Sequence, residues 1–165
     1  MKSGEYAFME IKLNLPDQEF RIERDQGGKL NIFDSLRKKF LVLTPEEWVR
    51  QHMIWFLINQ FRYPRSLFAL EKGLIYNTMS KRFDILVFDS EGSPFLLIEC
   101  KAPEVKLNQS TLEQVAVYNT QIKAPYIGIS NGLQHVFLSY DGKAQQYRQL
   151  SSIPYFPREN DDICQ

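Results

Sequence analysis

Three charged residues stand inside two apolar segments that otherwise have the composition of buried β-strands. The stretch KRFDILVFDSEGSPFLLIECKAP (81–103) carries Asp84 in the first segment and Glu99 and Lys101 at the end of the second. Burial disfavours a charged carboxylate, and two neighbouring carboxylates also repel each other, so such a pair needs a cation beside it. A divalent metal that prefers oxygen ligands, such as Mg²⁺, satisfies two carboxylates better than one lysine does. The residues indicate either a metal site or a cross-strand ion pair of Asp84 or Glu99 with Lys101.

The turn between the two segments decides how these charges meet. An even-length turn centred on Glu91-Gly92 places Asp84 opposite Glu99 on the neighbouring strand. Strand alternation then puts Asp84, Glu99 and Lys101 on one face and the Cys100 side chain on the other. Apolar residues fill the rest of both faces: Leu86, Phe88, Phe95 and Leu97 on the first, and Phe83, Ile85, Val87, Leu96, Ile98 and Cys100 on the second. We therefore expect core on both sides of this strand pair.

The segments around this pair predict the element order αβββαβ. Thr44, Pro45 and Glu47 have the spacing of an N-cap with a capping box, and they begin a helix that runs to about residue 61. Apolar, β-rich segments at 66–77, 82–89 and 94–101 predict three strands. A hairpin-like β elaboration, broken at 25–28, precedes this core.

A second helix and further strands complete the predicted sheet. Ser110 and Glu113 form another capping-box pattern, and the helix that they begin ends before Ala124-Pro125. A short strand follows at 126–130. Asn131-Gly132 and Asp141-Gly142 are two-residue turn signals, which add two antiparallel strands at the end.

Length and composition limit the broad class of the protein. The 165 residues are 44% hydrophobic and 24% charged, which fits a single domain: an N-terminal elaboration (1–40), a core (41–150) and a tail (151–165). Twenty basic and twenty acidic side chains cancel, which excludes the basic excess of a non-specific nucleic-acid coat protein. We expect a soluble, cytoplasmic protein, because no leader-like or membrane-spanning apolar run is present.

The cysteines and the glycine motifs indicate no further cofactor. Cys100 lies in an apolar strand and Cys164 in a polar segment, so neither a disulfide nor a zinc framework is expected. The chain has no G-x-x-x-x-G-K-[ST] phosphate loop, and therefore no motor module is expected.

The charged residues in this context resemble a known signature. Asp84 followed by Glu99-Cys100-Lys101 on the next strand resembles the D…(D/E)-x-K motif of the PD-(D/E)xK nuclease superfamily, whose core is also αβββαβ. More narrowly, residues 32–140 resemble the N-terminal nuclease domain of type I restriction enzyme R subunits. The similar stretches are LTPEEWVRQ, YPRSLFALE, KRFDILVFDSEGSPFLLIECKAP, QVAVYN and ISNG. One departure is Phe83, which stands where the superfamily name has proline, a position that varies widely.

The resemblance implies a role for each matching residue. Asp84 and Glu99 would bind Mg²⁺ or Mn²⁺ together with the Cys100 main-chain carbonyl, and Lys101 would orient or activate the attacking water. Metal-assisted hydrolysis of DNA phosphodiester bonds is the expected reaction.

Three further residues match the family but also have simpler interpretations. Gln114 and Tyr118 match its Q-x-x-x-Y motif and share a helix face, although they would also suit a polar pair at a helix edge. Glu47 matches an acidic residue that faces the metal in many such enzymes, but it is equally suited to capping its helix, in which case Glu46 could take the site role.

The remaining polar residues give weaker expectations. Phosphate contacts are expected from Arg50, Lys81, Arg82 and Lys106. Glu71 is expected to be structural, and His52 and His135 to be packing or surface residues.

Two functions of different classes remain open. The first is a Mg²⁺-dependent deoxyribonuclease, a bacterial stand-alone relative of R subunits that acts on DNA with other restriction or repair proteins. The second is a catalytically idle nuclease-fold module that binds nucleic acid or a partner protein. The complete set of Asp84, Glu99 and Lys101 favours the enzyme, and it also argues against a wholly structural domain.

Overall fold

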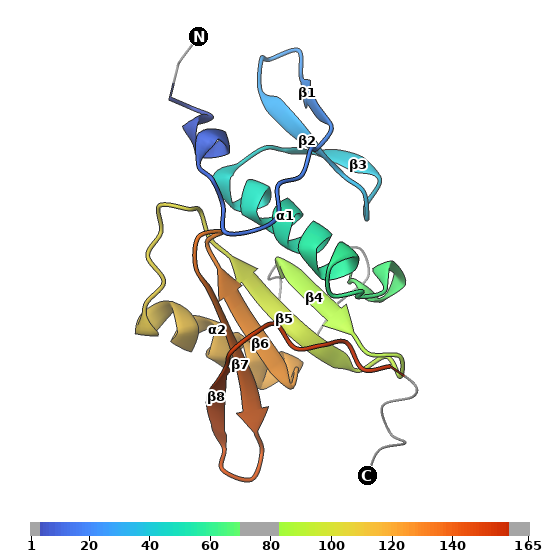
Figure 1. Ribbon diagram of the computed structural model, residues 1–165, viewed down its shortest axis with the longest axis vertical. Coiled ribbons are helices and arrows are strands. Elements are labelled where there is room, and N and C mark those ends of the chain that lie inside the picture. Colours follow the sequence, from blue (N-terminus) through green and yellow to red (C-terminus); the bar gives the residue numbers. More distant parts are fainter. Residues whose placement is uncertain (1–3, 70–82, 159–165) are drawn as a thin grey trace.

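The described residues of the computed structural model, 4–69 and 83–158, form two β-sheets and two α-helices (Figure 1). The elements of the first half are β1 (Ile22–Arg24), β2 (Leu30–Asp34), β3 (Lys39–Val42) and α1 (Pro45–Asn59), with 3-10 turns at Ala7–Glu10 and Arg65–Leu67. Those of the second half are β4 (Ile85–Phe88), β5 (Pro94–Cys100), α2 (Gln109–Ile122), β6 (Tyr126–Ser130), β7 (His135–Asp141) and β8 (Gln146–Leu150). The predicted mixed α/β class is confirmed.

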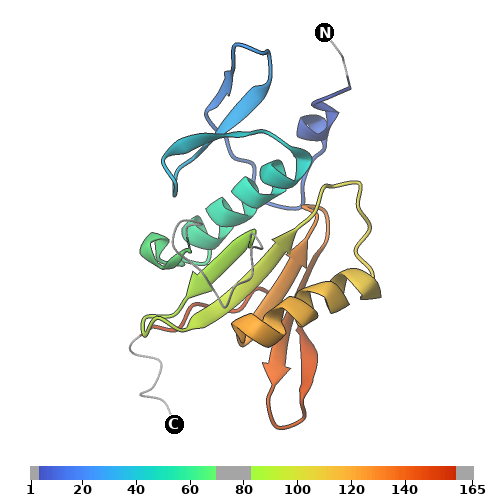
Figure 2. The same cartoon turned by 180° about the vertical axis from the view of Figure 1, so that it is seen from behind.

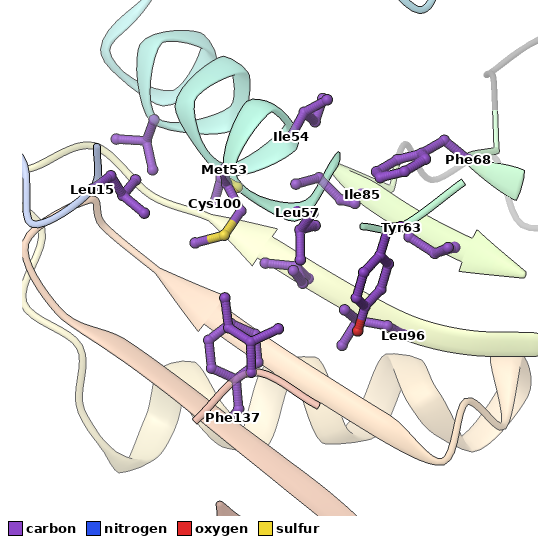
Figure 3. Close-up of a cluster of buried hydrophobic side chains, with 14 of the residues drawn as sticks. Leu15, Met53, Ile54, Leu57, Tyr63, Phe68, Ile85, Leu96, Cys100 and Phe137 are labelled. Carbon is purple, nitrogen blue, oxygen red and sulfur yellow. The ribbon is translucent and has the colours of Figure 1, made fainter. Parts of the chain in front are cut away.

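The five-stranded sheet has the order β4-β5-β6-β7-β8 and carries a helix on each face (Figures 1 and 2). Only its β5–β6 pair is parallel, and α2 supplies the crossover that a parallel pair needs. On one face Met53 and Leu57 of α1 lie over Ile85 and Leu96 (Figure 3). The other face packs against α2. The expectation of core on both sides of β4 and β5 is confirmed.

The pairing of β4 with β5 follows the predicted register, but the turn does not. Ile85 pairs with Ile98 and Val87 with Leu96, as expected. The loop, however, is three residues long: Asp89 N–H donates to the Ser93 carbonyl over 2.8 Å, and Gly92 has a left-handed φ of 82°. A bulge between Val87 and Phe88 restores the register, because Phe95 is left as an extra residue on β5.

Two of the predicted side-chain directions are corrected, one by this bulge and one by the start of β4. Phe95 packs with the α1-facing cluster, where its ring meets those of Tyr63, Tyr126 and Phe156. Phe83 precedes β4, lies outside the regular alternation and packs with the α2-facing cluster. Both assignments from the sequence were wrong, since strict alternation does not hold through a bulge or beyond a strand end.

The N-terminal residues form more than the predicted hairpin. β1 and β2 pair around the expected break near Gly28, and β3 adds a third antiparallel strand that the sequence did not predict. This sheet covers the outer side of α1, where Phe20 meets the rings of Trp48 and His52. The helix therefore lies between two layers (Figure 1).

The predicted start is correct for α1 and lies two residues too late for α2. Thr44 is the N-cap of α1, with Pro45 at its first position, as predicted. The N-cap of α2 is Asn108, and Thr111 completes its capping box. The prediction of Ser110 with Glu113 was wrong because Asn108 offers an equally good cap two residues earlier.

Three other parts of the chain differ from what the sequence predicts or extend beyond it. In the predicted strand 66–77, Phe68 makes a single bridge to Val87, Ala69 N–H donates to the Leu86 carbonyl over 2.8 Å, and residues 70–82 lie outside the described part. The loops before and after β7 each span four residues, 131–134 and 142–145, in place of two-residue turns. Residues 151–158 return over the α1-facing core, where Ile153 is buried and the Tyr63 hydroxyl donates to the Pro154 carbonyl.

Candidate active site

Asp84 and Glu99 lie opposite each other at one end of the β4–β5 pair. Asp84 directly precedes β4, and the pairing of Ile85 with Ile98 places it across from Glu99. The Cys100 N–H donates to Asp84 Oδ2 over 2.8 Å, which fixes one carboxylate oxygen beside the end of β5. Two strands that are otherwise apolar thus hold two acids side by side at one end.

Burial raises the pKa of both acids. The pKa of Glu99 rises to about 7, first through burial and then through the neighbouring Asp84 charge, while Lys101 opposes the rise. Burial also raises the pKa of Asp84, against the Cys100 hydrogen bond and the nearby charges of Arg50 and Lys101. Near neutral pH the pair therefore holds a proton or attracts a cation.

Lys101 supplies part of that positive charge. Its Nζ lies 3.4 Å from Glu99 Oε1, and the two side chains are 27% and 31% exposed. Its main-chain N–H donates to the Ser130 carbonyl over 2.8 Å, which anchors the residue to β6. The ion pair that the sequence left open is present, and one ammonium neutralises only one of two carboxylates.

The donor set around these acids suits a hard cation. Within a strand, the N–H and C=O of one residue face the same neighbour, so the Cys100 carbonyl faces the same edge as its N–H to Asp84. The Cys100 thiol lies buried on the α1 side, and burial raises its pKa well above the usual value. The described residues hold no group of three or more His, Cys, Asp or Glu side chains arranged for a metal. Mg²⁺ typically binds one or two carboxylates and completes its shell with water and phosphate oxygens, so the residues present fit it.

Tyr118 of α2 approaches Glu99, whereas Gln114 lies on the outer surface. A hollow of about 40 Å³ is lined by Phe83, Leu97, Glu99, Val115 and Tyr118. Gln114 is exposed and borders a shallow hollow on α2 that Tyr118 also lines. A larger hollow of about 880 Å³ lies between α2 and the β7–β8 hairpin, and the residues that line it include no predicted site residue.

The Glu47 carboxylate bonds Arg50, which contacts Asp84, and it does not cap its own helix. Thr44 Oγ1 accepts from the Glu47 N–H over 3.1 Å, but the Glu47 carboxylate accepts from Arg50 Nη1 over 2.8 Å and from Gln51 Nε2 over 2.7 Å. Glu46 is exposed. Of the two acids, α1 therefore turns Glu47 toward Arg50, which in turn contacts Asp84.

The predicted phosphate contact from Arg50 is wrong. Its side chain is buried, with Nε donating to the Asp84 main-chain carbonyl over 2.7 Å and Nη1 donating to Asp34 Oδ2 over 3.1 Å. A guanidinium with these partners cannot reach a DNA backbone. The expectation failed because sequence does not distinguish a surface arginine from one that finds buried acids.

Asp34, at the end of β2, is a partner of Arg50 that the sequence did not predict. Its side chain is fully buried and also pairs with Arg37 over 3.1 Å. Burial alone would raise the pKa of Asp34, but the hydrogen bond from the Arg37 main-chain N–H and the charge of Arg50 outweigh it, so the pKa is lowered. In the sequence it stands before a turn, where aspartate is common, so no signal pointed to Arg50.

The other predicted residues divide between those described and those outside the described part. Lys106 is exposed on the loop after β5. His52 and His135 are packing residues, as expected: His52 Nδ1 bonds the Trp48 carbonyl, and the His135 ring lies between Ser130 Oγ and the Asn14 carbonyl. Burial lowers the pKa of both histidines. Glu71, Lys81 and Arg82 lie outside the described residues.

Comparison with known protein families gave one match. The family model described as type I restriction enzyme R protein N terminus (HSDR_N) matches residues 45–154. Comparisons with curated proteins and with solved structures gave no match. None of the helices in the described part is long and apolar enough to cross a membrane.

Proposed function

We propose, because the chain belongs to the type I restriction enzyme R protein N-terminal family, that it is a metal-dependent nuclease domain of the PD-(D/E)xK type that hydrolyses DNA phosphodiester bonds. The observation that carries this proposal is the pair of adjacent, partly buried carboxylates of Asp84 and Glu99, with Lys101 beside them. A fold gains nothing in stability from two neighbouring acids whose pKa values rise on burial, so a cation that binds both explains their presence.

Two side chains and one main-chain carbonyl would hold the ion. Asp84 and Glu99 provide charged oxygens, and the Cys100 carbonyl faces the same edge. When bound, Mg²⁺ or Mn²⁺ supplies a water of lowered pKa and positive charge for the phosphate. Asp84 Oδ2 already accepts the Cys100 N–H, which limits the orientations that its carboxylate can take.

Lys101 would act on the attacking water or on charge that develops at the phosphate. Its ammonium is partly exposed, lies 3.4 Å from Glu99 Oε1 and is anchored through its main chain to β6. A cation fixed in this way needs little rearrangement as negative charge develops. Tyr118, which lines the hollow beside Glu99, and the exposed Gln114 would border the bound DNA, and Lys106 would contact its phosphates.

Cleavage of DNA by single-residue variants tests the proposal. The purified chain should cut plasmid or linear DNA in Mg²⁺ or Mn²⁺, and Lys101→Ala should abolish cutting while it keeps most Mn²⁺ binding in calorimetry. Asp84→Ala should lose the metal. Ca²⁺ should bind without supporting cleavage, because its looser coordination activates water less well.

A second lysine variant serves as the matched control. Lys143 is an exposed lysine on the β7–β8 loop, so Lys143→Ala should cut DNA at the wild-type rate. If the wild-type protein binds DNA but does not cut linear, nicked, branched or single-stranded substrates with any of these metals, and Lys101→Ala binds equally well, the chain is instead an idle DNA-binding module.

A further inference from the structure

Arg50 is a buried cation that joins three separate parts of the chain. Its side chain is on α1, and the whole residue is 5% exposed. Nε donates to the Asp84 carbonyl over 2.7 Å, while Nη1 donates to Asp34 Oδ2 over 3.1 Å and to Glu47 Oε1 over 2.8 Å. The main chain of Asp84 is therefore tied to both α1 and β2.

Asp34 fixes the position of this guanidinium. Its Oδ1 accepts the N–H groups of Leu36 and Arg37 over 2.9 and 3.0 Å, which holds the carboxylate against its own turn. Its Oδ2 then accepts from Arg50 and from Arg37. A carboxylate held by main-chain amides gives Arg50 an acceptor that does not move.

Asp84 is held at two points by this arrangement. Arg50 fixes its main-chain carbonyl where β4 begins, and the Cys100 N–H fixes its Oδ2. The first contact sets the direction of the backbone, and the second requires that direction in order to form. A planar guanidinium donates toward two partners at once in fixed geometry, whereas a lysine ammonium lacks this fork.

We infer that Arg50, anchored by Asp34, is a positioning residue that sets the Asp84 carboxylate for the metal ion. The inference rests on the proposed function for its consequence, and it extends the site beyond the family match, which begins at residue 45 and does not include Asp34. The three-stranded N-terminal sheet is then part of the active site through one carboxylate.

The test compares two arginines that pair with the same aspartate. The variants are Arg50→Lys, the milder Asp34→Asn, and the control Arg37→Lys, which changes the other arginine on Asp34. The first measurement, on the full chain without metal, is hydrogen exchange of the Cys100 amide relative to the Ile98 amide of the same strand. The second is the Kd for Mn²⁺ by calorimetry, with thermal unfolding as the check of folding.

Arg50→Lys should speed the relative exchange of the Cys100 amide about tenfold, because the hydrogen bond to Asp84 loosens locally. It should also weaken Mn²⁺ binding about tenfold, as expected when a partner that orients a metal ligand is lost. Asp34→Asn should also speed the relative exchange of the Cys100 amide and weaken Mn²⁺ binding, but by smaller factors. If Arg50→Lys does not fold, Asp34→Asn is the variant that decides the test. Arg37→Lys should lower the unfolding temperature with less than about a twofold change in either reading.

The outcomes separate this inference from the proposed function. If the Cys100 amide keeps its wild-type relative exchange in the folded variants, the inference is overturned even when the wild-type protein binds Mn²⁺. An equal response of Arg37→Lys in both readings also overturns it, because the network would then only stabilise the fold. If Arg50→Lys loosens the Cys100 amide but the wild-type protein binds no metal, Arg50 does position Asp84 and the nuclease proposal fails.

Discussion

Glu99 lies in an environment that differs strongly from that of an ordinary surface acid, because burial and the neighbouring Asp84 both raise its pKa. Its pKa of about 7 means that the metal-free folded protein holds a proton there that the unfolded chain releases near pH 4.5. The sequence indicated two adjacent acids, because both lie in apolar strands at matching distances from a turn. It could not indicate Arg50 or Asp34, since their proximity arises from the packing of separate elements.

Without metal, the protein should lose stability as pH rises from about 4.5 to about 7. The folded state binds more protons than the unfolded state between these two pH values, so the free energy of unfolding falls as pH rises through this range. Above about pH 7 this residue no longer changes the free energy of unfolding. After discounting for the 31% exposure of the side chain, the loss is about 2 kcal/mol. Urea unfolding of wild type and Glu99→Gln at pH 5 and pH 8 measures it.

The Glu99→Gln variant should lack most of this loss, because it has no carboxyl group to ionise at that position. Millimolar Mg²⁺ at pH 8 should restore stability to the wild-type protein and not to the variant. Parallel pH profiles for the two proteins would contradict the assigned pKa of Glu99.

At the scale of elements, the β4–β5 hairpin shows why a correct prediction can rest on an incorrect turn. The predicted register assumed an even loop, whereas the hairpin has a three-residue loop and compensates with a bulge. The charges therefore still meet, but Phe95 changes face. Apolar periodicity predicts where strands lie, and it carries no information about an inserted residue when both faces are apolar.

Gly92 should be sensitive to substitution for a conformational reason alone. It has a φ of 82°, and an added Cβ would meet no atom within 4 Å. Gly92→Ala should therefore cost about 1 kcal/mol in urea unfolding, the penalty of a left-handed backbone for an L-residue. Gly142 has equally open surroundings without this φ, so Gly142→Ala serves as the control and should be close to neutral. Equal effects would show that the Gly92 loop does not adopt this conformation.

The displaced start of α2 gives a second prediction at this scale. Asn108→Ala should lower the free energy of unfolding by about 1 kcal/mol, because the Asn108 side chain accepts the N–H of Thr111 at the helix start. Ser110→Ala should cost less, since Ser110 donates only to Asn108 Oδ1. Thermal or urea unfolding of both variants decides which residue caps the helix, and a larger loss for Ser110→Ala would return the cap to its predicted place.

At the scale of the whole molecule, the chain returns to its own core after the last strand. Residues 151–158 were expected to be part of a tail, because they show no helix or strand pattern that would reveal a surface for Ile153 and Phe156 to pack on. Both pack with the α1-facing cluster, close to Tyr63. Such contacts depend on a surface that many elements build together.

Ile153→Ala should destabilise the protein by about 2–4 kcal/mol, through lost burial and the cavity that remains. Its neighbour Tyr155 is 79% exposed, so Tyr155→Ala should cost less than about 1 kcal/mol. Urea unfolding of the two variants measures the difference. Similar small losses for both would mean that this segment does not stay on the core.

The burial of α1 between two layers also limits how this protein can change in evolution. An exchange of the first 44 residues between relatives would replace both the cover of Trp48 and the carboxylate that anchors Arg50. An incoming segment that matched the fold but lacked an acid at position 34 would leave a buried arginine short of a counter-charge. The N-terminal sheet and the helix beneath it are therefore expected to be inherited together, and substitutions at positions 34 and 50 should occur in pairs.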